Sequence, residues 1–141
     1  MSRRLAIAVA TVIVLAAAQL VPVSRENPPV EQIVPAPAEV SRVLERSCYD
    51  CHSHETVWPW YAWVAPVSWL VAHDVNEGRE HLNFSTWNRY DEEEQREKRE
   101  EVWEEVEEGE MPMAIYLPLH REAELSDADR RLLEAWSGSG D

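Results

Sequence analysis

The stretch Cys48-Tyr49-Asp50-Cys51-His52 is the most informative part of this 141-residue sequence. It holds the only two cysteines of the chain, three positions apart, and a histidine directly follows the second one. Two thiols one helical turn apart are able to add to the two vinyl groups on neighbouring edges of one porphyrin. The adjoining imidazole then lies under the ring and reaches the iron as its proximal ligand. The pattern C-x-x-C-H therefore predicts one covalently attached c-type haem.

Three other interpretations of this motif were weighed against haem attachment. A thioredoxin-like dithiol needs a βαβ setting, and no segment here has the period of a strand. A zinc site would have to combine the motif with His54, and so short a cluster rarely completes a tetrahedron. A disulfide between the two cysteines would close too small a loop to contribute much stability. Haem attachment is preferred, and a zinc-binding domain is kept as a less favoured alternative.

Residues 1–23 have the composition of an export segment. Two arginines precede a stretch from Leu5 to Leu20 that contains no charged side chain. We expect residues 5–23 to form an uncleaved membrane-anchor helix, because a spanning helix needs about 20 apolar residues. A cleaved signal peptide is the alternative, since Ala16-Ala17-Ala18 offers a cleavage site. Either version predicts that the domain lies on the extracytoplasmic side of the membrane.

The remainder of the chain is expected to be a Pro-rich linker and one all-α domain. Four of the nine prolines lie in residues 24–37, which favours an extended tether. Residues 38–137 are expected to form the domain, and no strand pattern or internal repeat is present. Apolar residues recur at helical spacing in four segments, at about 38–47, 66–78, 91–108 and from Ser126 onward. Gly78 and Gly109 are expected to end the second and third of these helices.

The charge of the chain excludes one class of partner. The sequence has 13 Lys and Arg against 27 Asp and Glu, a net charge of −14. Residues 28–141 alone keep 10 basic and 26 acidic side chains, so this part repels the phosphates of nucleic acids. We expect the acidic helix at 91–110 to be a solvated surface. The alternative is that it docks a redox partner that carries a basic patch.

A second iron ligand is expected on the loop after the acidic helix. Met111 is the preferred candidate, since Gly109 ends the helix before it and Pro112 stiffens the backbone after it. Methionine is a frequent axial ligand in electron-transfer cytochromes and raises their reduction potential. The alternatives that the sequence leaves open are Met113, His73, His81 and His120.

Several longer blocks make the interpretation more specific than the five-residue motif does. They are Cys48-Tyr49-Asp50-Cys51-His52-Ser53, Glu55-Thr56, Trp58-Pro59-Trp60-Tyr61, Ala65-Pro66-Val67-Ser68-Trp69, Gly78-Arg79, Asn83-Phe84-Ser85-Thr86-Trp87, Gly109-Glu110-Met111-Pro112, Tyr116 and Leu119-His120. Together they closely resemble the bacterial haem-binding domain family related to cytochrome c, from about Pro28 to Trp136. This resemblance implies a small cytochrome c-like helical domain around one haem, attached at Cys48 and Cys51 and ligated by His52. The similarity of the Met-Pro block to the distal loop of small cytochromes c favours Met111.

The aromatic residues are expected to form the wall of the haem pocket. Seven tryptophans against one phenylalanine is an unusual bias, and indoles suit the wall of a large flat ligand. The expected cofactor-binding residues besides the motif and Met111 are Trp58, Trp60, Tyr61, Trp63, Pro66 and Trp69. Such a closed pocket favours single-electron transfer, so we expect an electron carrier and not an enzyme. A haem-based sensor that binds a small ligand is the main alternative, and a peroxidase is a third.

Overall fold

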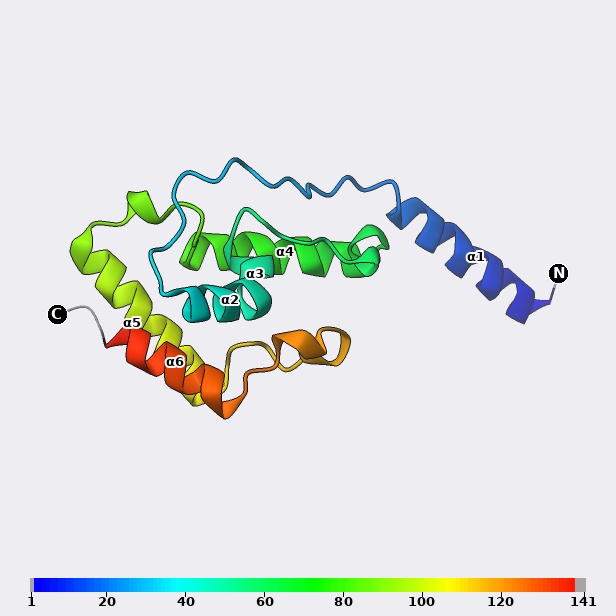
Figure 1. The fold of residues 1–141 in the computed structure, drawn as a ribbon. Coiled ribbons are helices and arrows are strands. Elements are labelled where there is room, and N and C mark those ends of the chain that lie inside the picture. Colours follow the sequence, from blue (N-terminus) through cyan, green and yellow to red (C-terminus); the bar gives the residue numbers. More distant parts are fainter. Residues whose placement is uncertain (1, 139–141) are drawn as a thin grey trace.

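Six α-helices make up most of the computed structural model, which describes residues 2–138 (Figure 1). They are α1 (Arg3–Ala18), α2 (Ala38–Ser47), α3 (Tyr49–His52), α4 (Val67–His81), α5 (Glu92–Glu108) and α6 (Asp127–Ser137). Four 3₁₀ turns lie between them, namely η1 (Trp60–Trp63), η2 (Trp87–Arg89), η3 (Leu117–Leu119) and η4 (Arg121–Ala123). No strand forms within the described residues, so the all-α prediction is confirmed for this part of the chain.

The core lies where α2, α5 and α6 meet. In α2 the helical spacing of Val40, Val43 and Leu44 puts all three on one buried face, and the helix has the predicted bounds. Helix α6 packs against both α5 and α2. Val106 of α5 and Leu133 of α6 belong to the same buried hydrophobic cluster as these α2 residues. Burial of this apolar surface is the main stabilising term for a domain of this size.

The ends of α5 and α6 follow the expected capping chemistry. The Asp91 side chain accepts from the backbone of Glu94, whose side chain accepts from Asp91 in return. Gly109, the C-cap residue of α5, has φ of +81°, in the left-handed region that favours glycine. Ser126 and Asp129 form the same reciprocal cap on α6. The predicted start of α6 and the predicted end of α5 are therefore confirmed.

Helix α4 differs from the prediction because it continues through Gly78 to His81. A Cβ atom at position 78 would lie 2.7 Å from the backbone oxygen of Cys51. Gly78 therefore permits close packing of α4 on α3 and does not end the helix. The expectation that Gly78 would end α4 was wrong. Glycine is needed there because the helix packs closely against Cys51, which is distant in the sequence.

The segment at residues 83–87, which leads from α4 into η2, lies in the core. Phe84 and Trp87 are fully buried and stack with ring centroids 6.2 Å apart. The Pro-rich segment runs along this connector in extended form. Val34 donates its N–H to the Phe84 carbonyl at 3.0 Å, and Trp87 donates to the Gln32 carbonyl at 3.0 Å. Part of the linker is thus bound to the domain.

The N-terminal helix is shorter than the anchor that the sequence predicted over residues 5–23. It ends at Ala18, and its 16 residues span about 24 Å at about 1.5 Å per residue. Beyond it, the Gln19 side chain accepts from the Ala65 N–H at 3.0 Å and donates to the Ala65 carbonyl at 3.2 Å. Among residues 2–138 we find no helix with the length and apolar character needed for crossing a bilayer. The expected anchor helix is therefore not supported.

Candidate cofactor site

A cavity of about 560 Å³ lies beside the C-x-x-C-H turn. Its walls come from α3, α4, α5 and the loop that follows α5. Cofactor pockets in proteins usually fall in the range of about 300–1,000 Å³. Four of the predicted site residues, Cys48, Cys51, His52 and Met111, line this cavity together although 59 positions separate His52 from Met111 in the sequence.

His52 is held in the form that a metal ligand requires. Its Nδ1 lies 2.9 Å from the carbonyl oxygen of Gly78 and 3.2 Å from that of Leu82. A carbonyl oxygen only accepts, so Nδ1 carries the hydrogen and Nε2 keeps a free lone pair. Burial lowers the pKa of His52 below its ordinary value, although the two hydrogen bonds oppose this shift. The residue is thus a neutral imidazole with one nitrogen available for ligation.

The two cysteines are free thiols at the start and the end of one helical turn. The His52 N–H donates to the Cys48 carbonyl at 3.0 Å, which closes that turn. Exclusion of solvent raises the pKa of Cys48 to about 12 and that of Cys51 to about 11. Zinc ligands and redox-active dithiols act as thiolates, which these surroundings disfavour. The local chemistry therefore agrees better with thiols destined for a covalent bond.

The loop after α5 brings two thioethers to the cavity. The Met111 N–H donates to the Glu105 carbonyl at 3.1 Å, directly after the left-handed turn at Gly109. Met111 and Met113 both line the cavity, so the structure places both predicted candidates beside it. Met113 also lines a neighbouring cavity of about 290 Å³, whereas Met111 does not.

Tyr116 connects this loop to the C-x-x-C-H turn. Its hydroxyl donates to Oδ2 of Asp50 at 2.7 Å, and the Asp50 Oδ1 accepts from the Val57 N–H at 2.8 Å. Burial, followed by the hydrogen bond to Asp50, raises the pKa of Tyr116 above its ordinary value. Sequence reasoning gave neither Tyr116 nor Asp50 a role. The available signal was an Asp inside the motif, at a position where haem attachment itself has no use for a carboxylate.

The predicted aromatic wall is not what surrounds the cavity. Its apolar lining comes from Leu82, Phe84, Val102 and Val106. Trp60 and Tyr61 line the smaller cavity instead, which shares Asp50, Cys51, Asp74, Met113 and Tyr116 with the larger one. Trp58, Trp63, Pro66 and Trp69 line neither. A high tryptophan content does not indicate which way the side chains point. The turn η1 is too short for a periodic pattern to show which of its residues face the cavity.

The histidines that were alternative ligands lie in different settings. His81 lines the larger cavity. His73 faces solvent on α4 and lies 3.4 Å from Glu77. His120 accepts from the Tyr61 hydroxyl at 2.7 Å and stacks on Tyr116 at 4.0 Å, so other groups already engage its ring.

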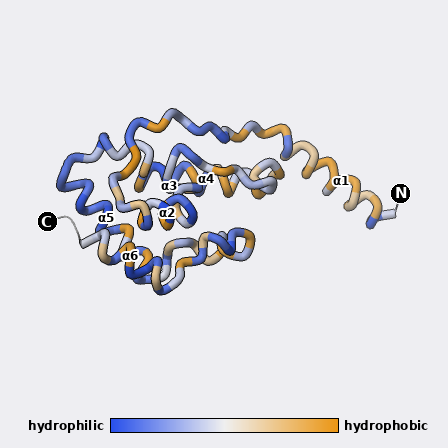
Figure 2. The backbone as a smooth tube through the Cα atoms, in the orientation of Figure 1, coloured by the Kyte–Doolittle hydropathy of each residue, from blue (hydrophilic) through white to orange (hydrophobic). Residues whose placement is uncertain are grey.

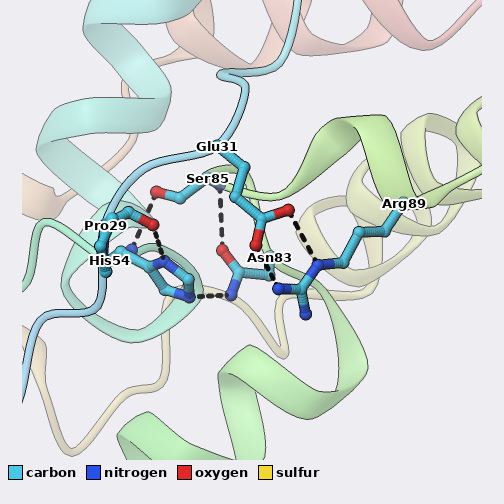
Figure 3. A network of polar contacts seen from close by, with 6 residues as sticks. All are labelled: Pro29, Glu31, His54, Asn83, Ser85 and Arg89. Carbon is cyan, nitrogen blue, oxygen red and sulfur yellow. Dashed lines mark hydrogen bonds and ion pairs between the residues drawn. The ribbon is translucent and has the colours of Figure 1, made fainter.

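A zinc site with His54 does not agree with the geometry. His54 donates from Nδ1 to the Pro29 carbonyl and accepts at Nε2 from the Asn83 amide, both at 2.9 Å (Figure 3). Ser85 and the Glu31–Arg89 ion pair complete this network, which joins the Pro-rich segment to the domain. Both ring nitrogens of His54 are thus occupied. Within residues 2–138 the one group of three spaced for a metal is His73, Asp74 and Glu77 on α4, and it contains neither cysteine.

Comparison with known proteins agrees with this site. A family model described as "Haem-binding domain" matches residues 13–139. No curated protein and no solved structure matches the chain. Because the family match covers far more than half of the sequence and includes every wall of the cavity, this protein belongs to the haem-binding domain family and binds haem.

Proposed function

We propose that this protein is a cytochrome c-like electron carrier with one haem attached to Cys48 and Cys51 and ligated by His52 and Met111. One observation carries the proposal. Two free thiols, an imidazole with an open Nε2 and a thioether line one cavity of suitable size. A bound haem supplies an iron that takes up and releases one electron.

The side chains of the protein have three tasks in this function. Gly78 and Leu82 fix the orientation and the tautomer of His52 through its Nδ1–H. Gly109 and Tyr116 hold the methionine loop at its two ends. Phe84, Val102 and Val106 keep water away from the cavity wall, which favours electron transfer over exchange of ligands.

Haem staining of a denaturing gel, together with intact mass, tests the covalent bond. Expression uses a host that attaches c-type haem. The wild-type chain should keep the porphyrin mass after denaturation, and the Cys48→Ser/Cys51→Ser variant should lose it. Ser47→Ala serves as a matched control, because Ser47 lines the same cavity and carries no thiol. A wild-type chain without porphyrin mass would contradict the proposal and favour a zinc site or a redox-active dithiol.

Visible spectra test the sixth ligand. Met111→Ala should abolish the long-wavelength band of methionine-ligated ferric haem, while Met113→Ala and His81→Ala should keep it. Rapid stoichiometric binding of azide or cyanide to the wild-type ferric protein would exclude a firm sixth ligand.

A haem-based sensor is the second candidate function. The cavity of about 290 Å³ next to the larger one has an apolar lining and offers room for a small ligand. Binding of carbon monoxide to the reduced wild-type protein would favour the sensor over the carrier. Turnover with hydrogen peroxide would instead indicate an enzyme, which we do not propose.

The site of action is proposed to be the extracytoplasmic side of the bacterial inner membrane. Residues 1–23 support this proposal, since two arginines precede a charge-free apolar segment. Protease added to intact spheroplasts should digest an exported domain and spare a cytoplasmic control protein.

A further inference from the structure

Charged side chains are missing from three separate stretches of the sequence. Charged residues make up 28% of the chain, yet none occurs in residues 5–24, 56–72 or 111–119. The first stretch includes α1 from Leu5 onward, the second includes η1 and the beginning of α4, and the third includes the methionine loop and η3. Haem binding explains Met111 and Met113, but it does not explain the rest of these stretches.

The three stretches meet at one end of the molecule. Gln19, just after α1, exchanges two hydrogen bonds with Ala65. Arg25 donates to the Ala62 carbonyl at 2.6 Å, and its guanidinium lies 4.3 Å from the ring centre of Trp63. Ile115 and Leu119 of the third stretch line the smaller cavity together with residues of the second. Figure 2 shows apolar α1 leaving the domain at this end, while the hydrophilic helix α5 lies at the other.

The apolar side chains at this end face outward. The apolar end is defined here by Trp60, Trp63, Trp69, Leu70, Ile115 and Leu119, all of which are exposed. Trp60 is 76% exposed and Ile115 is 74% exposed. An exposed apolar surface of this kind usually binds another molecule or a membrane.

We propose that the apolar end lies at the headgroup level of a lipid bilayer, with α1 inserted into the apolar layer beneath it. Tryptophan is enriched at that depth because its ring is apolar and its N–H still reaches polar groups. None of the six residues of the apolar end is charged, so they contact lipid without the cost of desolvating an ion. The Arg25 guanidinium over Trp63 lies among the headgroups in this arrangement. This arrangement turns the acidic surface of α5 toward water. It does not depend on haem.

Helix α1 favours lipid over a second protein copy as the occupant. Val12, Ile13 and Val14 are consecutive, point in different directions around the helix, and are each more than 60% exposed. A helix that is apolar all round needs an apolar medium on every side, whereas a docked protein would cover one face. The contacts of Gln19 and Arg25 make this helix continuous with the apolar end.

Photolabelling from the lipid side tests this proposal on the full mature protein. Phosphatidylcholine vesicles carry a photoreactive group on their acyl chains, and labelled peptides are identified by mass spectrometry. We expect label on the peptides that contain Trp60, Trp63 and Ile115, with no label on α5 or α6. Neutral lipid is chosen because the contact is apolar, so labelling should not change between low and high salt.

A pair of matched variants makes the test specific. Trp60→Glu/Trp63→Glu places charges on exposed positions and should abolish labelling of residues 56–72. Ala135→Glu adds a charge to an exposed position of α6 and should leave labelling unchanged. Circular dichroism confirms that the variants are folded. Label confined to α1, or cross-links between the apolar ends of two copies without lipid label, would overturn the proposal.

Discussion

Gly78 supports the C-x-x-C-H turn in two ways. Its carbonyl accepts the Nδ1–H of His52, and its missing side chain leaves room for the backbone of Cys51. The nearest atom to a new Cβ would be a backbone oxygen, which is unable to swing away as a flexible side chain would. The requirement for glycine at this position is therefore steric and does not come from backbone dihedral angles.

The variant Gly78→Ala should lower the free energy of unfolding by about 1–3 kcal/mol, as overpacking in tight cores does. A methyl group 2.7 Å from the Cys51 oxygen has to push α4 away from α3. Chemical denaturation of the haem-loaded protein measures this change. In an uncrowded helix the same substitution usually stabilises, so an increase in stability would disprove the close contact.

Gly138→Ala is the matched control for this measurement. The nearest atom to a Cβ at position 138 is 3.8 Å away, and φ is −83°. Both values suit alanine. The free energy of unfolding should therefore change by less than about 1 kcal/mol, in the stabilising direction.

Tyr116→Phe tests how the methionine loop is held. The variant keeps the ring that stacks on His120 and removes only the hydrogen bond to Asp50. We expect a stability loss of about 1 kcal/mol and, if Met111 ligates the iron as proposed, weakening of the long-wavelength band of methionine-ligated haem. An unchanged band alongside reduced stability would show that Tyr116 stabilises the fold without positioning the ligand.

Among the elements, local sequence predicted the helices whose ends are determined by their own residues. The cap at Ser126 and the left-handed turn at Gly109 depend on residues within a few positions, and the apolar spacing that predicted α2 lies within that helix. The full extent of α4 and the burial of Phe84 depend on contacts with distant segments, so no local pattern revealed them. The same difference holds at the site. Its cysteines and histidine form a local motif, whereas the tryptophans were assigned from composition alone.

The cap of α6 gives a prediction with a definite pH dependence. Partial burial raises the pKa of Asp129, but hydrogen bonds from Ser126 and the nearby Arg46 outweigh it, and the net pKa is lowered. A lowered folded pKa stabilises the protein above the ordinary value near 3.8, and this contribution is lost as pH falls through the lowered value.

Asp129→Asn should therefore lower the free energy of unfolding at pH 7 by roughly 1 kcal/mol. The difference from the wild type should shrink as the pH falls below 3.8. Denaturant midpoints at several pH values measure both effects. Ser126→Ala removes the other half of the cap and should lower the free energy of unfolding by about 1 kcal/mol, both at pH 7 and at low pH. An Asp129→Asn effect of equal size at all pH values would show that the carboxylate charge contributes nothing.

Across the whole molecule, charge is distributed unevenly between the two ends. Glutamates cover α5, whereas the six residues of the apolar end are uncharged and only the Arg25 guanidinium is placed over one of them, Trp63. Such a distribution gives the domain a strong dipole, which would orient a basic redox partner toward α5. Since exposed acids also serve solubility alone, kinetics have to distinguish docking from solvation.

The variant Glu92→Lys/Glu93→Lys/Glu94→Lys should slow electron transfer with a basic partner steeply at low salt if α5 is the docking surface. The effect should fade at high salt, because screening shortens the reach of the charges to about 10 Å at 0.1 M. Stopped-flow reduction at two ionic strengths measures it. Equal rates for variant and wild type would leave solubility as the role of these acids.

The contact between Gly78 and Cys51 also has a consequence for the order of biogenesis. Once α4 has packed on α3, the backbone of the C-x-x-C-H turn lies against another helix and both cysteines are only partly exposed. If haem is attached to the two cysteines as proposed, the attaching enzyme needs the chain before α4 packs on α3. We expect an apoprotein that has already folded to be a poor substrate for this attachment, and an unfolded chain to be a good one.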